Sequence, residues 1–230
     1  MKTIARFLPG DAIIRLQCVI IVVVALVFSA LLGSRFFSVA NFQSIGSQLP
    51  ILGMLALGMG MTMLTGGINL SIIAGANACS LVMAAIIVTH PDNPLFLVLA
   101  LLAGAAVAVA IGTLNGALIA WVGVSPILAT LGTMTLISGL NILLSNGTVI
   151  SGFPTAIQYL GNATIAGIPV ALLLFFLVAI LLWVLLEHTT LGRSLYLVGS
   201  NEQATRYSGV NTVRVQISVY VISALRSEEH

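Results

Sequence analysis

Long apolar segments alternate with short polar clusters along most of the chain. The clusters contain Gly, Pro, Asn and Ser, residues that favour turns and loops. Several apolar segments approach or exceed the ~20 residues that an α-helix needs to cross the hydrocarbon core of a membrane. The pattern predicts six membrane-spanning helices, near residues 18–33, 45–64, 68–88, 95–120, 126–144 and 168–186. A seventh apolar segment, from about Val213 to Leu225, is too short for a full crossing.

Composition supports a membrane protein, because 59% of the 230 residues are apolar and only 6% are charged, with a mean hydropathy of +1.17. Soluble domains carry about 25% charged residues, so this composition excludes a water-exposed globule. Helices satisfy their backbone hydrogen bonds internally, as lipid requires, whereas a membrane β-barrel would need short alternating strands. The expected fold class is an all-α polytopic membrane protein with six full transmembrane helices and a truncated seventh.

The basic residues predict the orientation of the chain, since Lys and Arg are enriched in cytoplasmic segments. Six crossings place the segment before the first span and the segment after the sixth on the same side. These two segments hold most of the basic residues: Lys2, Arg6, Arg15, Arg193, Arg206 and Arg214. Only Arg35 falls on the other side. We therefore expect a cytoplasmic N-terminus and an outward-facing loop at residues 145–167.

A cleaved signal peptide is the alternative interpretation of the first apolar segment. Such peptides end in a small-residue cleavage site. Here Arg35, Phe36 and Phe37 follow the segment. This sequence favours a retained first helix.

One predicted helix carries a small residue at every fourth position. Side chains four residues apart share a helix face, and a stripe of small residues on that face lets another backbone approach closely. We interpret the stripe as a helix-packing surface formed by Ala100, Gly104, Ala108, Gly112 and Gly116.

Uncharged polar residues punctuate the third, fourth and fifth predicted spans. Interhelical hydrogen bonding explains most such residues in membrane proteins. The alternative is that they line a path for a polar, uncharged solute. The candidates for this substrate path are Asn69, Ser71, Asn115, Thr130, Thr133 and Asn141.

Every Asp, Glu, Lys and Arg lies outside the six predicted spans. Proton-driven carriers generally need ionisable groups inside the membrane. The GxxxxGK[ST] phosphate loop is also missing, because Lys2 is the only lysine. Uphill transport by this chain would therefore need another subunit to supply the energy.

The sequence does not indicate an enzyme, and no cofactor or metal is expected. Cys18 and Cys79 lie in separate apolar segments, where small buried apolar side chains are the simplest interpretation. The three histidines, His90, His188 and His230, are scattered and form no nucleophile–base set or metal cluster.

A polar segment near the C-terminal end, residues 191–210, predicts a short helix of its own. Ser200 and Gln203 fit an S-x-x-Q capping box, and Gly209 suits the position just after the helix. Two helical turns do not persist alone in water, so the helix needs a surface to pack against. An ordinary solvated loop helix is the alternative.

Three stretches resemble permease subunits of bacterial ribose-type ABC importers. TGGINLS at residues 65–71 is similar to the family signature TGGIDLS, with Asn69 where Asp is usual. NGALIA at residues 115–120, followed by Pro126 and TLGTMT at 130–135, resembles a second family region. The third stretch, residues 190–210, resembles the cytoplasmic coupling loop, whose Glu-Ala-Ala…Gly motif corresponds here to Gln203, Ala204, Thr205 and Gly209.

The resemblance implies a heteromeric importer of a ribose-like monosaccharide in the bacterial inner membrane. Two permease chains would form the translocation path on two cytoplasmic ABC ATPase subunits. A periplasmic sugar-binding protein would deliver the substrate, and no nucleic acid is involved. The implied ATPase-coupling residues are Gly192, Arg193, Gly199, Ser200, Asn201, Gln203, Ala204, Thr205 and Gly209.

Residues 1–225 are expected to form the membrane permease domain, incomplete relative to the family, because members usually have about a hundred residues more. Residues 226–230 form a polar tail unlike the family. A truncated or frameshifted gene product is therefore expected. Other possibilities are a related permease for nucleosides, branched-chain amino acids or a furanosyl signal, and a non-transporting remnant or membrane scaffold.

Overall fold

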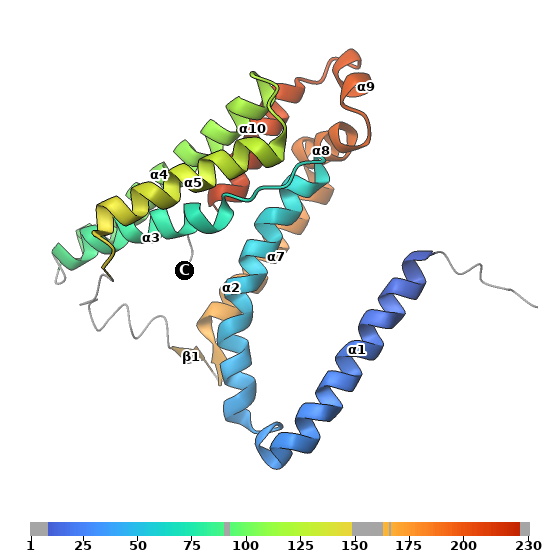
Figure 1. Cartoon of the computed structure of the whole chain (residues 1–230), viewed down its shortest axis with the longest axis vertical. Coiled ribbons are helices and arrows are strands. Elements are labelled where there is room, and N and C mark those ends of the chain that lie inside the picture. Colours follow the sequence, from blue (N-terminus) through green and yellow to red (C-terminus); the bar gives the residue numbers. More distant parts are fainter. Residues whose placement is uncertain (1–8, 90–92, 149–162, 166, 226–230) are drawn as a thin grey trace, which may run out of the picture. The chain divides into compact units, whose positions relative to one another are not determined.

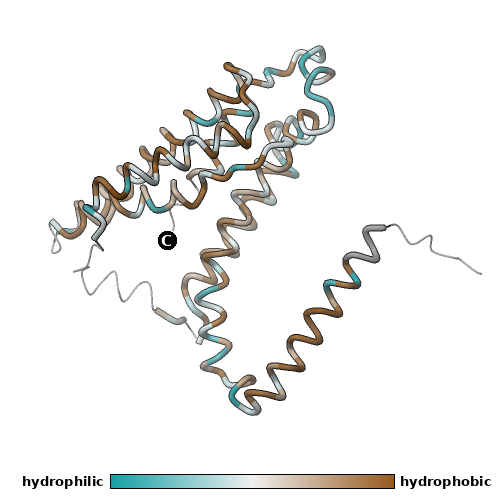
Figure 2. The backbone as a smooth tube through the Cα atoms, viewed as in Figure 1, coloured by the Kyte–Doolittle hydropathy of each residue, from teal (hydrophilic) through white to brown (hydrophobic). Residues whose placement is uncertain are grey.

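The computed structural model describes residues 9–89, 93–148, 163–165 and 167–225. The chain divides into two compact units, residues 1–46 and 47–230. The first unit contains α1 (Pro9–Leu32) and a short 3-10 helix, η1 (Gly33–Arg35). From residue 14 onward almost every side chain of α1 is exposed, and Figure 2 shows that the helix is hydrophobic along most of its length. A helix that is apolar all round requires a lipid or protein environment.

The second unit consists almost entirely of helices (Figure 1). The long ones are α2 (Val39–Leu64), which begins in the first unit, α3 (Ile72–Thr89), α4 (Pro94–Ala120), α5 (Pro126–Ser145) and α7 (Val170–His188). The shorter ones are α8 (Thr190–Ser200), α9 (Glu202–Tyr207) and α10 (Thr212–Leu225). Together with α1, the described residues contain six helices long and apolar enough to cross a membrane, which confirms the predicted polytopic helical fold.

Several predicted helix starts differ from the observed ones, by two to nine residues. The first two spans begin earlier than predicted, at Pro9 and Val39, because polar residues at a helix end do not stop the helix. The third begins at Ile72 and not at residue 68, because residues 65–71 adopt a non-helical path. The sixth begins at Val170, after a two-stranded hairpin formed by β1 (Thr164–Ile165) and β2 (Ile168–Pro169).

The fold is therefore helical apart from this hairpin, which the all-α expectation did not include. The first strand of the hairpin lies in the predicted outward-facing loop at residues 145–167, and the second lies at the start of the predicted sixth span. Most of that loop, residues 149–162 and 166, lies outside the described residues, as does the polar tail at 226–230.

The C-terminal part of the small-residue stripe of α4 faces α10. A Cβ atom on Gly112 would lie 2.5 Å from Val221 Cα, and one on Gly116 would lie 2.7 Å from Ile217 Cα. Gly112 faces Val221 and Gly116 faces Ile217, so residue numbers increase along α4 while those of the facing α10 residues decrease. The two helices are therefore antiparallel. The other members of the stripe, Ala100, Gly104 and Ala108, are also buried.

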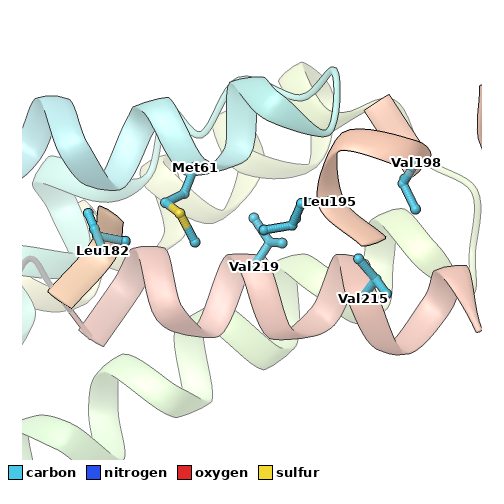
Figure 3. Packing of buried hydrophobic residues seen from close by; sticks show 6 residues of the cluster. All are labelled: Met61, Leu182, Leu195, Val198, Val215 and Val219. Carbon is cyan, nitrogen blue, oxygen red and sulfur yellow. The ribbon is translucent and has the colours of Figure 1, made fainter. Parts of the chain in front are cut away.

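A second contact region joins the end of α2 to the C-terminal helices. It is a cluster of buried apolar side chains from α2, α7, α8 and α10, shown in Figure 3: Met61, Leu182, Leu195, Val198, Val215 and Val219. The amphipathic helix α8 buries one face in this cluster. The segment that follows the sixth span is thus attached to the membrane helices by apolar packing.

Candidate functional site

The main irregular feature of the helical unit is the segment at residues 65–71, hereafter the broken segment, which separates α2 from α3. The chain leaves α2 through Gly66, whose φ of +81° is a left-handed conformation that suits glycine. The amide N–H of Gly67 donates to Thr62 O and that of Gly66 to Met63 O, each at 3.0 Å. These two bonds form a Schellman motif, which satisfies the last carbonyl groups of α2.

Close packing explains the second glycine of the broken segment. A Cβ atom on Gly67 would lie 2.5 Å from Tyr220 Oη and 3.2 Å from Pro126 Cβ. The broken segment therefore lies between α10 and the first turn of α5, with no room for a side chain at position 67.

A directed chain of buried hydrogen bonds connects the broken segment to three helices. Asn115 Nδ2 on α4 donates to Ser71 Oγ at 2.7 Å, and Ser71 Oγ donates to Asn69 Oδ1 at 2.8 Å. Asn69 Nδ2 donates to Ser223 Oγ on α10 at 3.3 Å, and Ser223 Oγ donates to Gly58 O in α2 at 2.9 Å. The four side chains are at most 2% exposed, so each bond replaces one that water would otherwise supply.

A backbone group fixes the direction of this chain. The amide N–H of Ser71 donates to Asn69 Oδ1 at 3.1 Å. An N–H group cannot accept, so the oxygen of the Asn69 amide must face Ser71 and its NH₂ group must face Ser223.

Thr130 on α5 holds the broken segment from another side. Its Oγ1 accepts a hydrogen bond from Leu70 N at 3.2 Å and donates to Pro126 O at 2.7 Å, with Ile68 O at 3.1 Å. Thr130 is fully buried. The hydroxyl therefore joins the first turn of α5 to the backbone of the broken segment.

The structure thus places the six candidate path residues in two groups. Asn69, Ser71, Asn115 and Thr130 come together at the broken segment. Thr133 is buried one turn further along α5, and Asn141 donates from Nδ2 to Ala74 O of α3 at 3.1 Å.

Sequence reasoning missed Tyr220 and Ser223 of α10, which complete the site. Little in the sequence indicates a role for these two residues, because α10 is short and they lie three positions apart in an apolar segment. In the described part of the chain, two buried side-chain atoms have no hydrogen-bond partner, and these are Asn115 Oδ1 and Tyr220 Oη. Both atoms belong to side chains around the broken segment.

The polar segment after the sixth span differs from its prediction in its helix boundary. It forms two helices, α8 and α9, and Asn201 separates them with an extended backbone (φ −162°, ψ 100°). Asn201 Oδ1 accepts a hydrogen bond from Ala204 N at 3.0 Å, so Asn201 is the N-cap of α9. The predicted cap, Ser200, is the last residue of α8, and its Oγ donates to Leu197 O at 3.0 Å. The capping-box interpretation of Ser200 was therefore wrong by one residue.

The end of α9 follows the prediction for Gly209. This glycine has a φ of +86°, and its N–H donates to Arg206 O at 3.1 Å. Val210 N donates to Thr205 O at 3.4 Å, which completes a Schellman motif.

The residues suggested for ATPase coupling lie in two environments. Gly192 and Gly199 of α8 face other helices, because a Cβ atom would meet the carbonyl oxygen of Leu186 at the first position and that of Leu64 at the second. Thr205 is buried, with Oγ1 donating to Asn201 O at 2.8 Å. The exposed members are Arg193, Gly199, Ser200, Asn201, Gln203, Ala204 and Gly209, and Gly199 is exposed although a Cβ atom on it would meet Leu64. The outer surface of α9 is therefore free for contact.

These features define a class of protein: a polytopic helical membrane protein with neutral, buried polar contacts and a polar helix pair after its sixth span. Residues 41–226 match the family described as the permease component of branched-chain amino acid transport systems, and the chain belongs to this family. The result agrees with the family expected from the sequence motifs.

Known relatives are import permeases. The chain is 34% identical over 206 residues to the ribose import permease protein of Bacillus subtilis, covering 89% of this chain and 63% of the relative. It is 32% identical over 200 residues to the autoinducer 2 import permease protein of Yersinia enterocolitica (84% and 59% covered). It is 29% identical over 206 residues to the D-allose transport permease protein of Escherichia coli (90% and 62% covered).

The chain therefore spans about three fifths of the length of these relatives. No solved structure matches the chain.

Proposed function

We propose that this chain is the permease subunit of an ATP-driven importer for a ribose-like monosaccharide. The observation that carries the proposal is the similarity to a ribose import permease over 89% of this chain. The chain would sit in the bacterial inner membrane with its N-terminus in the cytoplasm. It would act with a second permease chain, cytoplasmic ABC ATPase subunits and a periplasmic sugar-binding protein.

A furanosyl signal is the second candidate substrate. Its support is the autoinducer 2 import permease, which is nearly as similar to this chain as the ribose permease, at 32% against 34% identity. Both interpretations use a polar, uncharged solute and the same assembly.

In the proposed mechanism, α9 receives the motion of the ATPase. The Schellman motif at Gly209 sets the direction in which the chain leaves α9 for α10. α10 carries Ser223 and Tyr220, which contact the broken segment. Closure of the ATPase subunits would thus shift α10 and, through it, the polar contacts between α2, α4 and α5. Alternating access by movement of whole helix groups is the general mode of such carriers.

Co-purification tests the assembly. A tagged full-length chain, co-expressed with a ribose-type ABC ATPase subunit, is expected to retain the ATPase through detergent extraction and to support uptake of labelled ribose in cells that lack their own ribose permease. Retention of the ATPase with uptake of autoinducer 2 instead of ribose would favour the second candidate. Failure to retain any such ATPase would contradict the importer proposal.

Replacing Gly209 with valine is expected to reduce uptake more strongly than ATP hydrolysis. A β-branched residue is strained at a φ of +86°, so the end of α9 should change direction. Substrate-stimulated ATPase activity and uptake are measured together in reconstituted vesicles. Gly123→Val is the matched control, because Gly123 also has a positive φ (+77°) with nothing within 4 Å of its Cβ position but lies in the turn after α4. An equal loss of coupling in both variants would refute a special role for Gly209.

A further inference from the structure

Helix α8 lies across the ends of two membrane-spanning helices. Gly192 near its start packs on the carbonyl groups of Leu185 and Leu186, close to the end of α7 at His188. Gly199 near its other end packs on the carbonyl group of Leu64, the last residue of α2. Because α2 and α7 are both long enough to cross a membrane, α8 is held at the depth where these helices leave the hydrocarbon core.

The two faces of α8 differ in environment. Leu195 and Val198 are 0% and 4% exposed and pack into the apolar cluster of Figure 3. On the opposite side, Tyr196 and Leu197 remain 45% and 50% exposed, next to the exposed Arg193. The outer face thus combines an aromatic residue, an aliphatic residue and a cation at the membrane surface.

This combination matches the lipid headgroup region more closely than it matches water. Tyr and Trp are enriched where hydrocarbon meets headgroups, and Lys or Arg close to the membrane surface is attracted to anionic lipids. The neighbouring end of α7 carries an exposed Trp183, whose ring lies against His188 with centroids 5.3 Å apart. Trp183 on α7 and Tyr196 on α8 are thus exposed aromatic residues on two consecutive helices.

We propose that α8 is an interfacial helix whose outer face, formed by Arg193, Tyr196 and Leu197, is embedded in the headgroup region of the bilayer. Arg193 contacts lipid phosphates, while Tyr196 and Leu197 reach the upper part of the acyl chains. Helix α9 differs in being mostly polar, because Glu202, Gln203 and Arg206 are exposed on it and Tyr207 is its one exposed aromatic residue. Lipid thus holds α8 in place, and the polar helix α9 projects into water. The proposal needs only the membrane-spanning helices and does not depend on the transported solute.

Site-directed spin labelling of the full chain in lipid vesicles tests this arrangement. Cys18 and Cys79 are the two cysteines of the chain and are first replaced, as Cys18→Ser and Cys79→Ala. Labels are then attached through Leu197→Cys on α8 and, as the control, Gln203→Cys on α9. The label at position 197 is expected to be more accessible to oxygen than to a water-soluble nickel chelate, and the label at 203 should show the reverse. Water-like accessibility at 197 would overturn the proposal.

Two further experiments, which vary the vesicle composition and add an ATPase subunit, distinguish lipid from protein as the partner of the outer face of α8. Adding phosphatidylglycerol to phosphatidylcholine vesicles should move the label at 197 deeper, and Arg193→Gln should remove this dependence. A dependence that persists in Arg193→Gln would refute the role of Arg193. Shielding of position 197 that appears only when the ATPase subunit is added would show that α8 binds protein and would overturn the lipid assignment. Loss of ATPase binding with position 197 still in lipid would contradict only the importer proposal.

Discussion

Replacing Gly112 with valine is expected to lower the thermal stability of the protein strongly. A Cβ atom at this position would lie 2.5 Å from Val221 Cα, 2.7 Å from Tyr220 O and 2.8 Å from Val221 N. All three are backbone atoms of α10, so no side-chain rotation can relieve the collision. Overpacking of a well-packed core costs roughly 1–3 kcal/mol, and a collision with backbone belongs at the upper end. Such a loss lowers the midpoint of thermal unfolding by about 6–12 °C.

The measurement is the fraction of monodisperse protein that remains after heating in detergent. Gly132→Val on α5 is the matched control, because Gly132 is exposed and its Cβ position has nothing within 4 Å. Valine and glycine differ by only a few tenths of a kcal/mol in helix propensity, so the control should retain wild-type stability. Equal losses in the two variants would mean that α4 does not approach α10 closely.

Removing the amide of Asn69 is the change with the second-largest expected effect. Asn69→Ala takes an acceptor from the N–H and hydroxyl groups of Ser71 and a donor from Ser223. Because these groups are buried, the loss should amount to about 2–3 kcal/mol. Thermal unfolding in detergent measures the decrease. Ser223→Ala alone should cost about 1 kcal/mol, since one bond to Asn69 and one to Gly58 O are lost.

A double-mutant cycle distinguishes a connected network from independent contacts. If Asn69 and Ser223 interact as observed, the double variant should be less destabilised than the sum of the single variants by about 0.5–1 kcal/mol. Strict additivity would contradict the hydrogen bond between the two side chains.

The membrane fold could be predicted from the sequence because the signal is simple. Long apolar segments, bounded by residues that favour turns, have only one solution in lipid, namely the helix. Helix ends were less certain, as the starts at Pro9 and Val39 demonstrate. At these positions the helices include polar residues such as Asp11 and Asn41, so hydropathy alone does not mark where each helix begins.

The broken segment was predicted only in part, because the predicted spans stop at residue 64 and resume at residue 68, whereas α3 begins at Ile72. Ile68 and Leu70 extend the apolar pattern of α3 towards its N-terminus, and they concealed the loss of helical structure at residues 68–71. Gly66 and Gly67 were the available signal, since adjacent glycines commonly end helices. The α10 residues that face these glycines are determined by long-range packing. No local sequence pattern predicts them.

Helix α8 was missed for a different reason. Only eleven residues long, it has too few turns for its periodicity to stand out beside the stronger capping pattern that follows it. The choice of Ser200 over Asn201 as a cap has a similar origin. Both residues are good N-caps, and the extended backbone that selects Asn201 becomes visible only in three dimensions.

The amide at position 69 has a consequence for the acid–base behaviour of the protein. Asn69, Ser71, Asn115, Thr130 and Ser223 are all groups that neither gain nor lose a proton near neutral pH. An aspartate in place of Asn69 would bring a titratable group into this dry junction and would require the Ser223 hydroxyl to turn away from Gly58. With asparagine at position 69, the hydrogen-bond donors and acceptors at the junction between α2, α4 and α10 are the same at acidic and at neutral pH.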